Sequence, residues 1–371
     1  MFMDNMKKTD RNWDKTTFAD IMSPAKVVLC GNRKDLPVLS ITMHDGIVEQ
    51  KDRFKKVIAS HDTSKYKVVK NGQLVIAFPI DEGLIYTQDV ADEGIMSPAY
   101  NVWDVNYEGL DRRFLGLYFH SPVAMAYYKD NLRGTTQRRR SLPKDVLLSM
   151  PIPMPTLVKQ KEIVSELDGI SSTISLLQSQ ISDLDALKKS TFYDMFGEPE
   201  LNDKGWDSYT FEQKFKLKSG DSLSSKDFIK GEYPVYGGNG ISGQHNAYNM
   251  DGDYIIVGRV GAYCGNARNV KGKFWLTDNA FNLIYKKDEY NSIYLTELLS
   301  ILDLHKYSNQ AAQPVISNVT LKGVQVIIPP MPLQLSFASK VGAVDEAKAS
   351  LNSQIAEMQT LLAARMQYWF E

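Results

Sequence analysis

The sequence predicts an α+β protein with two sheet-containing globular domains separated by two long helices, which pack as an antiparallel coiled coil with approximate two-fold symmetry. Residues 155–196 carry apolar side chains at alternating steps of three and four, and residues 332–370 repeat this pattern. A globular segment precedes each copy, and the two globular segments open and close alike. We expect domains at 1–154 and 198–331, and helices at 155–197 and 332–371.

The apolar positions of the two helical segments have the a/d spacing of helices that face one another. In the first segment they are Ile163, Leu167, Ile170, Ile174, Leu177, Ile181, Leu184 and Leu187. In the second they are Phe337, Val341, Val344, Leu351, Ile355, Met358 and Leu362, with Lys348 as the polar position. Roughly 40 residues would span about 60 Å as a helix. We favour antiparallel pairing within one chain over a parallel coil between chains, because both partners are present at high effective concentration.

Prolines introduce each helical segment, in the runs 151–155 and 328–332. They hold the chain extended and cannot continue a helix, so they favour a sharp helix start.

Each globular segment opens with Trp-Asp, at Trp13 and at Trp206, and the two six-residue openings share four residues. Runs of β-branched and aromatic residues follow, separated by Asn-Gly, Asp-Gly and Gly-Gly steps, which predicts a largely antiparallel sheet. The runs are residues 38–42, 66–69 and 74–78 in the first segment and 233–236, 254–257 and 281–285 in the second. One helical stretch is expected in each, at 114–129 and 293–307.

The closing sequences match at a different offset from the openings. Gln137, Ser141 and Ile152 stand 176 positions before Gln313, Ser317 and Ile328, whereas the openings are 193 positions apart. The second domain is therefore about 17 residues shorter. The helical segments also end alike, at Met195-Phe196 and Trp369-Phe370, so we expect a cyclic duplication that brings Glu371 near Met1.

Composition permits nucleic-acid binding without demanding it. The net charge is -1, but the globular segments sum to +4 and the helical segments to -5. Two cysteines cannot form a metal cluster or a disulfide framework. The polar residues 1–11 do not form a signal peptide, and no apolar run approaches the roughly 18 residues of a membrane span. We expect a cytoplasmic protein without membrane contact.

These features together resemble the specificity subunit of type I restriction–modification enzymes, over nearly the whole chain. The resemblance lies in paired globular segments that each lead through Ile-Pro into a long heptad helix. Segments that are similar to the family's are Gly134–Gln137, Gln160–Val164, Leu187–Ser190 and Tyr233–Gly243. The second helix departs from the pattern, since Leu335–Ala338 stands where Gln-Lys-x-Ile is expected.

The resemblance implies a non-catalytic subunit whose domains each read one half of a bipartite DNA site. The helix pair would set the unread gap and dock two methyltransferase subunits, which bring S-adenosylmethionine, and restriction subunits would join that complex. This chain would need no cofactor of its own. A rigid spacer suits such a role, because half-sites on one face of DNA repeat at about 34–36 Å. The alternative is an adaptor that holds two protein- or glycan-binding modules at a fixed separation.

Several motifs that suggest catalysis have simpler explanations. Gly238–Gly243 matches a dinucleotide-binding pattern, but turn-like sequence follows it, so we expect a glycine-rich loop close to DNA or to a neighbouring strand. Asp45, Glu49 and Lys51 lack the surroundings of a metal-dependent nuclease site. The five histidines have no metal-ligand spacing. We therefore predict no catalytic residue and no metal site.

Candidate DNA contacts are basic, amide and aromatic residues in turn-rich stretches, since arginine can grip either guanine or phosphate. In the first domain they are Arg112, Arg113, Lys129, Arg133, Gln137, Arg138, Arg139 and Arg140. In the second they are Asn239, His245, Asn246, Arg259, Tyr263, Asn266, Arg268, Lys271 and Lys273. Ordinary solvated charge is the alternative for each, and we expect most contacts to reach phosphates.

Overall fold

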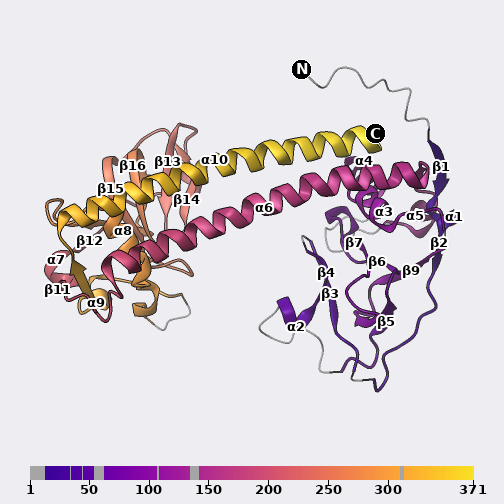
Figure 1. Cartoon of the computed structure of the whole chain (residues 1–371), viewed down its shortest axis with the longest axis horizontal. Helices are drawn as coiled ribbons and strands as arrows, with labels where there is room; N and C mark the ends of the chain where they lie inside the picture. Colours follow the sequence, from indigo (N-terminus) through magenta and orange to yellow (C-terminus); the bar gives the residue numbers. More distant parts are fainter. Residues whose placement is uncertain are drawn as a thin grey trace. The chain divides into compact units, whose positions relative to one another are not determined.

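The computed structural model describes residues 13–33, 35–43, 45–53, 62–106, 108–133, 142–309 and 313–371 (Figure 1). The chain forms two compact units. Unit 1 comprises Met1–Leu176 with Ile355–Glu371, and unit 2 comprises Leu177–Gln354. Each unit therefore contains one sheet-bearing domain and one half of each long helix.

Unit 1 begins with β1 (Asp14–Thr17), which pairs antiparallel with β10 (Pro151–Met154). Short α1 (Phe18–Ile21) follows β1. A four-stranded sheet has the order β2 (Met22–Pro24), β9 (Asn101–Val105), β6 (Leu74–Ile76), β7 (Ile85–Thr87). Two further antiparallel pairs are β3 (Leu39–Thr42) with β4 (Gly46–Glu49), and β5 (Lys67–Lys70) with β8 (Glu93–Met96). The short helices are α2 (Gln50–Arg53), η2 (Ile80–Glu82) and α5 (Lys144–Leu148).

Unit 2 repeats the first pairing with β11 (Asp207–Thr210) and β18 (Gln325–Ile328), followed by α7 (Phe211–Lys214). Its main sheet has six strands, ordered β12 (Lys216–Ser219), β17 (Ala280–Ile284), β15 (Met250–Gly258), β16 (Ala267–Leu276), β13 (Tyr233–Gly237), β14 (Gly240–His245). Only β13 and β16 pair in parallel among these strands. The short helices are η4 (Ser225–Asp227), α8 (Ser292–Ile301), η5 (Leu304–Tyr307) and α9 (Asn318–Leu321).

The helical stretch expected at 114–129 is two helices, α3 (Arg112–Phe119) and α4 (Pro122–Asn131). The break has a local cause. Ser121 caps α4 by accepting a hydrogen bond from the Ala124 N–H, and Pro122 occupies the first helical position. Because proline cannot donate to the preceding turn, α3 cannot continue through it.

The two long helices are α6 (Leu157–Phe196) and α10 (Met331–Phe370). They run antiparallel in both units, as predicted. In unit 1, Lys159 lies 5.1 Å from the ring centroid of Trp369, and Glu166 accepts hydrogen bonds from Arg365 and Trp369. Burial raises the pKa of Glu166, but the hydrogen bonds and charge of its partners outweigh burial, so the pKa is lowered.

In unit 2, Phe192 near the end of α6 packs against Phe337 near the start of α10, with ring centroids 5.6 Å apart. Further along, Lys348 donates to Asp185 Oδ1 at 2.5 Å. The polar residue in the predicted seam therefore has an acidic partner on the facing helix.

One predicted seam position is wrong. Leu187 is 51% exposed, whereas Ile163 and Leu167 are fully buried. The inward position near Leu187 belongs to Lys188, whose ammonium group lies 2.8 Å from a carboxylate oxygen of Glu297 on α8. The next inward-facing residue after Leu184 is therefore four positions further along rather than three. The spacing changes because this part of α6 packs against the unit 2 domain as well as against α10.

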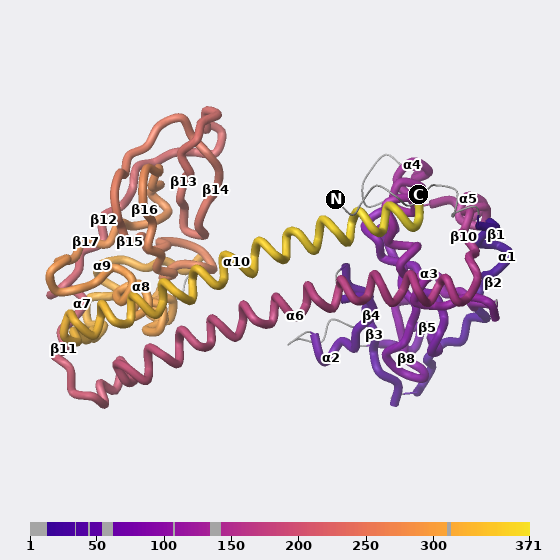
Figure 2. Tube along the Cα trace, turned by 45° about the horizontal axis from the view of Figure 1, so that its top comes forward, coloured from indigo at the N-terminus to yellow at the C-terminus, as the bar shows by residue number. Residues whose placement is uncertain are grey.

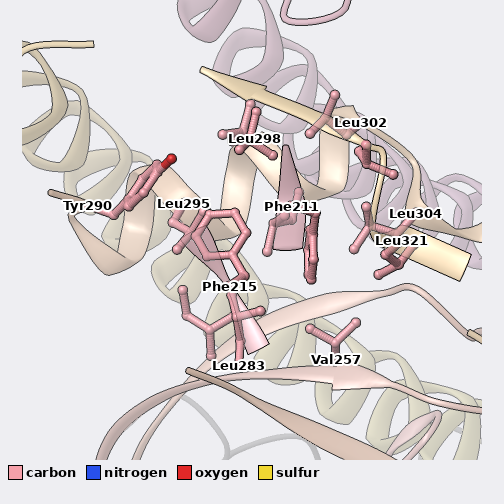
Figure 3. Close-up of a cluster of buried hydrophobic side chains, with 14 of the residues drawn as sticks. Phe211, Phe215, Val257, Leu283, Tyr290, Leu295, Leu298, Leu302, Leu304 and Leu321 are labelled. Atoms are coloured by element: carbon pink, nitrogen blue, oxygen red, sulfur yellow. The ribbon is translucent and has the colours of Figure 1, made fainter. Parts of the chain in front are cut away.

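Each unit has its own apolar core. In unit 2, Leu295 and Leu298 of α8 and its C-cap residue Leu302 face Val257 and Leu283 of the sheet, with Phe211 and Phe215 between them (Figure 3). The end of α6 completes this core through Phe192 and Phe196, and the start of α10 does so through Phe337 and Val341.

In unit 1 the core contains Phe114 and Tyr118 of α3 together with Trp369 and Phe370 of α10. The Phe370 ring centroid lies 5.5 Å from that of Phe114 and 5.7 Å from that of Tyr118. The C-terminal end of α10 accordingly lies beside α3 and α4 in both views (Figures 1 and 2). The end of α10 therefore completes the core of unit 1, as the end of α6 completes the core of unit 2.

The start of each long helix is joined to its domain by a buried glutamine at an equivalent position. Gln160 on α6 and Gln334 on α10 are both fully buried and stand 174 positions apart. The equivalent segment of the second helix is therefore Gln334–Phe337 rather than Leu335–Ala338. It keeps the glutamine and still departs from Gln-Lys-x-Ile, with Leu335 at the lysine position and Phe337 at the isoleucine position. The duplication extends to hydrogen bonds, because the Phe18 and Phe211 N–H groups bond equivalent carbonyls at 2.9 and 2.8 Å.

Candidate nucleic-acid interface

Four loop segments of unit 2, far apart in sequence, lie together, and the glycine-rich loop at residues 237–240 is the first of them. A Cβ on Gly238 would lie 3.0 Å from Val260 O and 3.1 Å from Asn279 O, and a Cβ on Gly258 would lie 2.5 Å from Gly238 O. Only glycine permits such close backbone contact. The loop expected close to DNA or to a neighbouring strand therefore lies against the end of β15.

The fourth segment joins through backbone pairing. Val260 forms an isolated antiparallel bridge with Val315, and the Gly261 N–H donates to Pro314 O at 2.9 Å. Exposed Gln313 directly precedes Pro314. We call the side chains of these segments the unit 2 polar cluster, which consists of Asn239, Arg259, Tyr263, Asn266, Arg268, Asn279 and Gln313.

Arg259 lies at the centre of the unit 2 polar cluster. Its guanidinium carbon lies 5.4 Å from the ring centroid of Phe281, and Nη1 donates to Asp278 O at 3.3 Å. The backbone N–H of Arg259 donates to Asn279 O at 2.9 Å. Within the described residues, this leaves most of the five guanidinium N–H donors for a ligand. A fork of donors held on an aromatic ring suits a phosphate or a guanine edge.

Arg268, at the start of β16, approaches the same glycine-rich loop. A Cβ on Gly240, whose φ is +103°, would lie 3.0 Å from Arg268 Nη1. Glycine at this position therefore lets the backbone turn and leaves room for the guanidinium. Tyr263 is 50% exposed and Asn266 is also exposed, so both can contact a partner.

Cys264 lies beneath the cluster and is not suited to nucleophilic chemistry. Its Sγ lies 3.2 Å from His305 Nδ1, but the thiol is fully buried. Burial raises the pKa of Cys264, which outweighs hydrogen bonding, so the thiol form is favoured. We interpret the pair as a packing contact that supports the loop.

Asn279 and Gln313 were not among the predicted DNA contacts. Both are exposed and border Arg259 or its neighbours. Asn279 follows Thr277-Asp278 in the turn between β16 and β17, and that turn composition was the available signal. Gln313 belonged to the repeated closing sequence, but only the fold brings it beside residues 50 positions earlier.

Four other predicted residues of unit 2 lie outside the unit 2 polar cluster. His245 is only 7% exposed, its Nδ1 accepts the Ile229 N–H at 3.1 Å, and its ring centroid lies 5.5 Å from that of Trp275. It is therefore a packing residue rather than a base reader. Lys271 and Lys273 are exposed on β16, opposite Asp253 and Asp251 in the strand register. Neighbouring carboxylates reduce their attraction for a polyanion. Exposed Asn246, directly after β14, remains a candidate.

The candidates of unit 1 fall into three groups. Gln137, Arg138, Arg139 and Arg140 lie outside the described residues. Arg112 and Arg113 open α3, where they line a cleft of about 580 Å³ with Asp45, Tyr86 and His120. Lys129 and Arg133 are exposed near the end of α4.

Arg113 is committed to a structural ion pair. Its Nε and Nη2 donate to the Asp168 carboxylate of α6 at 2.6–3.0 Å. The hydrogen bonds to Asp168 raise the pKa of Arg113. Arg113 thus ties α3 to α6, and we remove it from the proposed DNA contacts, whereas exposed Arg112 remains.

Among the residues that the structure describes, no group of three or more His, Cys, Asp and Glu side chains could hold a metal ion. The described helices also include none with the length and apolar character that crossing a membrane requires.

Comparisons with known proteins agree with the duplicated architecture. The family model described as "Type I restriction modification DNA specificity domain" matches residues 32–186 and again 203–358. The EcoprrI type I restriction enzyme specificity subunit of Escherichia coli is 28% identical over 210 residues, which cover 54% of this chain. The match covers 51% of that relative, so the chain spans about half its length.

Two solved structures share the fold over almost the whole chain. The S subunit of a type I restriction-modification system from M. genitalium matches with a TM-score of 0.57 and 16% identity, covering 99% of this chain and 98% of that one. A chain from a study of complex assembly and conformational transition of the type I R-M system matches with a TM-score of 0.59 and 17% identity, covering 97% of both.

Proposed function

Because the chain belongs to the family of type I restriction modification DNA specificity domains, we propose that it is the sequence-reading, non-catalytic subunit of a type I restriction–modification complex. Each domain reads one half of a bipartite double-stranded DNA site. The paired helices α6 and α10 set the unread gap between the halves. The reading domains correspond to residues 1–154 and 198–331, and the helices to 155–197 and 332–371.

The observation that carries the proposal is the repeated unit. One kind of domain occurs twice, each time joined by the same hydrogen bonds to the start of one long helix and packed on the end of the other. A protein with one binding site has no use for this duplication, whereas a reader of two half-sites needs two domains of one kind. The unit 2 polar cluster supplies one reading surface, and the basic run Arg138–Arg140, which lies outside the described residues, is the candidate for the other.

The chemistry of the complex resides in its partners. Two methyltransferase subunits dock on the helix pair and bind S-adenosylmethionine, and restriction subunits then complete the complex. Two copies of one partner suit a chain with two equivalent units. The adaptor alternative receives no support from the family match.

Methylome mapping tests the proposal. The chain is expressed with the methyltransferase encoded beside it, in a host without other adenine methylation, and modified adenines are mapped across the genome. We expect a single bipartite motif with an unread gap of fixed length. Methylation without sequence preference, or at one continuous short motif, contradicts the proposal.

Substitutions assign the unit 2 polar cluster to one half of the motif. We expect Arg259→Ala and Asn279→Ala to relax or abolish recognition of one half only, with a cost of about 1–3 kcal/mol for each base contact. Lys322→Ala is the matched control, because Lys322 is an exposed cation outside the cluster. If Arg259→Ala acts through a phosphate, affinity falls for every sequence and the salt dependence becomes shallower. Unchanged affinity and motif in both cluster variants rule out this surface.

A further inference from the structure

Gln160 makes three hydrogen bonds where α6 begins. Its Nε2 donates to Gly109 O at 3.0 Å and to Pro155 O at 2.9 Å, and its Oε1 accepts the Asp111 N–H at 2.7 Å. The side chain is fully buried. Both amide hydrogens and the carbonyl oxygen are therefore used.

Gln334 makes the same three bonds where α10 begins. Its Nε2 donates to Glu289 O at 2.9 Å and to Pro329 O at 2.8 Å, and its Oε1 accepts the Asn291 N–H at 2.8 Å. The partners occupy equivalent places in the two units. Asp111 and Asn291 are the N-cap residues of α3 and α8, and Pro155 and Pro329 directly follow β10 and β18.

Each glutamine thus joins three parts of its unit: the long helix, the strand that leads into it and the N-terminus of the domain's first large helix. The apolar contacts around this joint are non-directional, so they resist separation more than rotation. Three hydrogen bonds to one amide fix orientation, because hydrogen bonds weaken steeply as their angles deviate. A small rotation at the joint is carried outward to the loops of the domain.

We propose that Gln160 and Gln334 are positioning residues that fix the angle between each reading domain and its long helix, and thereby the length of the unread gap that the protein accepts. The inference rests on the proposed function. Consecutive base pairs are about 3.4 Å apart along the DNA axis. A joint that rotates freely enough to move the reading loops by this distance accepts a gap one base pair too long or too short.

The test compares methylation rates of duplexes that differ only in the gap. The complex of the full chain with its methyltransferase is given the mapped site with the natural gap, and the same half-sites with one base pair added or removed. The variants are Gln160→Met and Gln334→Met, since methionine is close in volume and makes no comparable hydrogen bonds. Gln178→Met on α6 and Gln359→Met on α10 are matched controls at exposed helical positions.

We expect the ratio of rates, natural gap over altered gap, to fall at least tenfold in each joint variant and to stay at the wild-type value in both controls. A destabilised but correctly angled protein lowers all rates together and leaves the ratio unchanged. An unchanged ratio in the joint variants therefore overturns the inference, even where overall methylation drops.

A second variant keeps the test decisive if methionine prevents folding. Gln160→Asn retains the amide but is one methylene shorter, so it cannot reach all three partners at once. A reduced ratio in a folded Gln160→Asn protein supports the inference, and a wild-type ratio overturns it. A wild-type complex that modifies no bipartite site, or all gaps equally, refutes the proposed function and is recognised before any variant is made.

Discussion

Leu167 and Leu187 lie on one helix, were both predicted in its apolar seam, and differ in burial. Leu167 is fully buried in the unit 1 core, and Leu187 is 51% exposed. Leu167→Ala removes three buried carbon atoms, a transfer cost of roughly 2.4 kcal/mol at about 0.8 kcal/mol per methylene. The cavity left behind brings the expected loss in free energy of unfolding to about 3–4 kcal/mol. Leu187→Ala should cost about 0.5 kcal/mol or less.

Guanidinium unfolding followed by circular dichroism measures both variants. Because two units can unfold in separate steps, tryptophan fluorescence is followed as well, and the step that shifts is assigned to a unit. Leu167→Ala should shift the step of unit 1. Equal losses for the two variants, or a larger loss for Leu187→Ala, would show that α6 presents a different face to its neighbours and would refute this packing.

Three further predictions concern other residues. Gly169→Ala should raise the free energy of unfolding by about 0.5–1 kcal/mol, since Gly169 is helical with open space around it. Gly197→Ala should lower the free energy of unfolding by about 1 kcal/mol or more, because Gly197 has φ +76° and little room for a Cβ. Thermal unfolding compares the two variants. Glu166→Gln should cost about 1 kcal/mol or less at neutral pH. Burial raises the pKa of Glu166, but its hydrogen bonds to α10 lower the pKa below the usual 4.5. The stabilisation from the ionised carboxylate is therefore fully present above pH 4.5 and is lost as the pH falls through the folded-state pKa. Unfolding of the wild-type protein and of Glu166→Gln across pH measures this stabilisation. His245→Ala should lower stability by about 2 kcal/mol and leave the methylated motif unchanged, unlike Arg259→Ala, and a changed motif would restore His245 as a reader.

The long helices could be predicted from the sequence because their apolar periodicity extends over many turns. The pairs β1–β10 and β11–β18 could not, because prolines in β10 disguise a strand as a linker. Leu187 was misplaced because a heptad pattern assumes one facing partner, and α6 meets a second one at Glu297. The structural role of Gln160 and Gln334 could not be predicted, since a single buried amide has no periodic signature in the sequence.

For the candidate interface, the sequence indicated the glycine-rich loop and most of its arginines. It could not indicate which loops meet, because the contact between Gly238 and Asn279 depends on the order of strands in the sheet. Burial of His245 follows from an aromatic neighbour thirty residues later, Trp275, and this too is set by the fold.

Trp369 and Phe370 have a consequence for synthesis of the protein on the ribosome. They fill the core of unit 1, in which every other buried residue is made before Leu177. The ribosome must first translate all of Leu177–Gln354, which takes roughly 10–35 s at typical bacterial and eukaryotic rates. During that interval the nascent first domain exposes Phe114 and Tyr118 to the cell, so unit 2 can close first although it is encoded second.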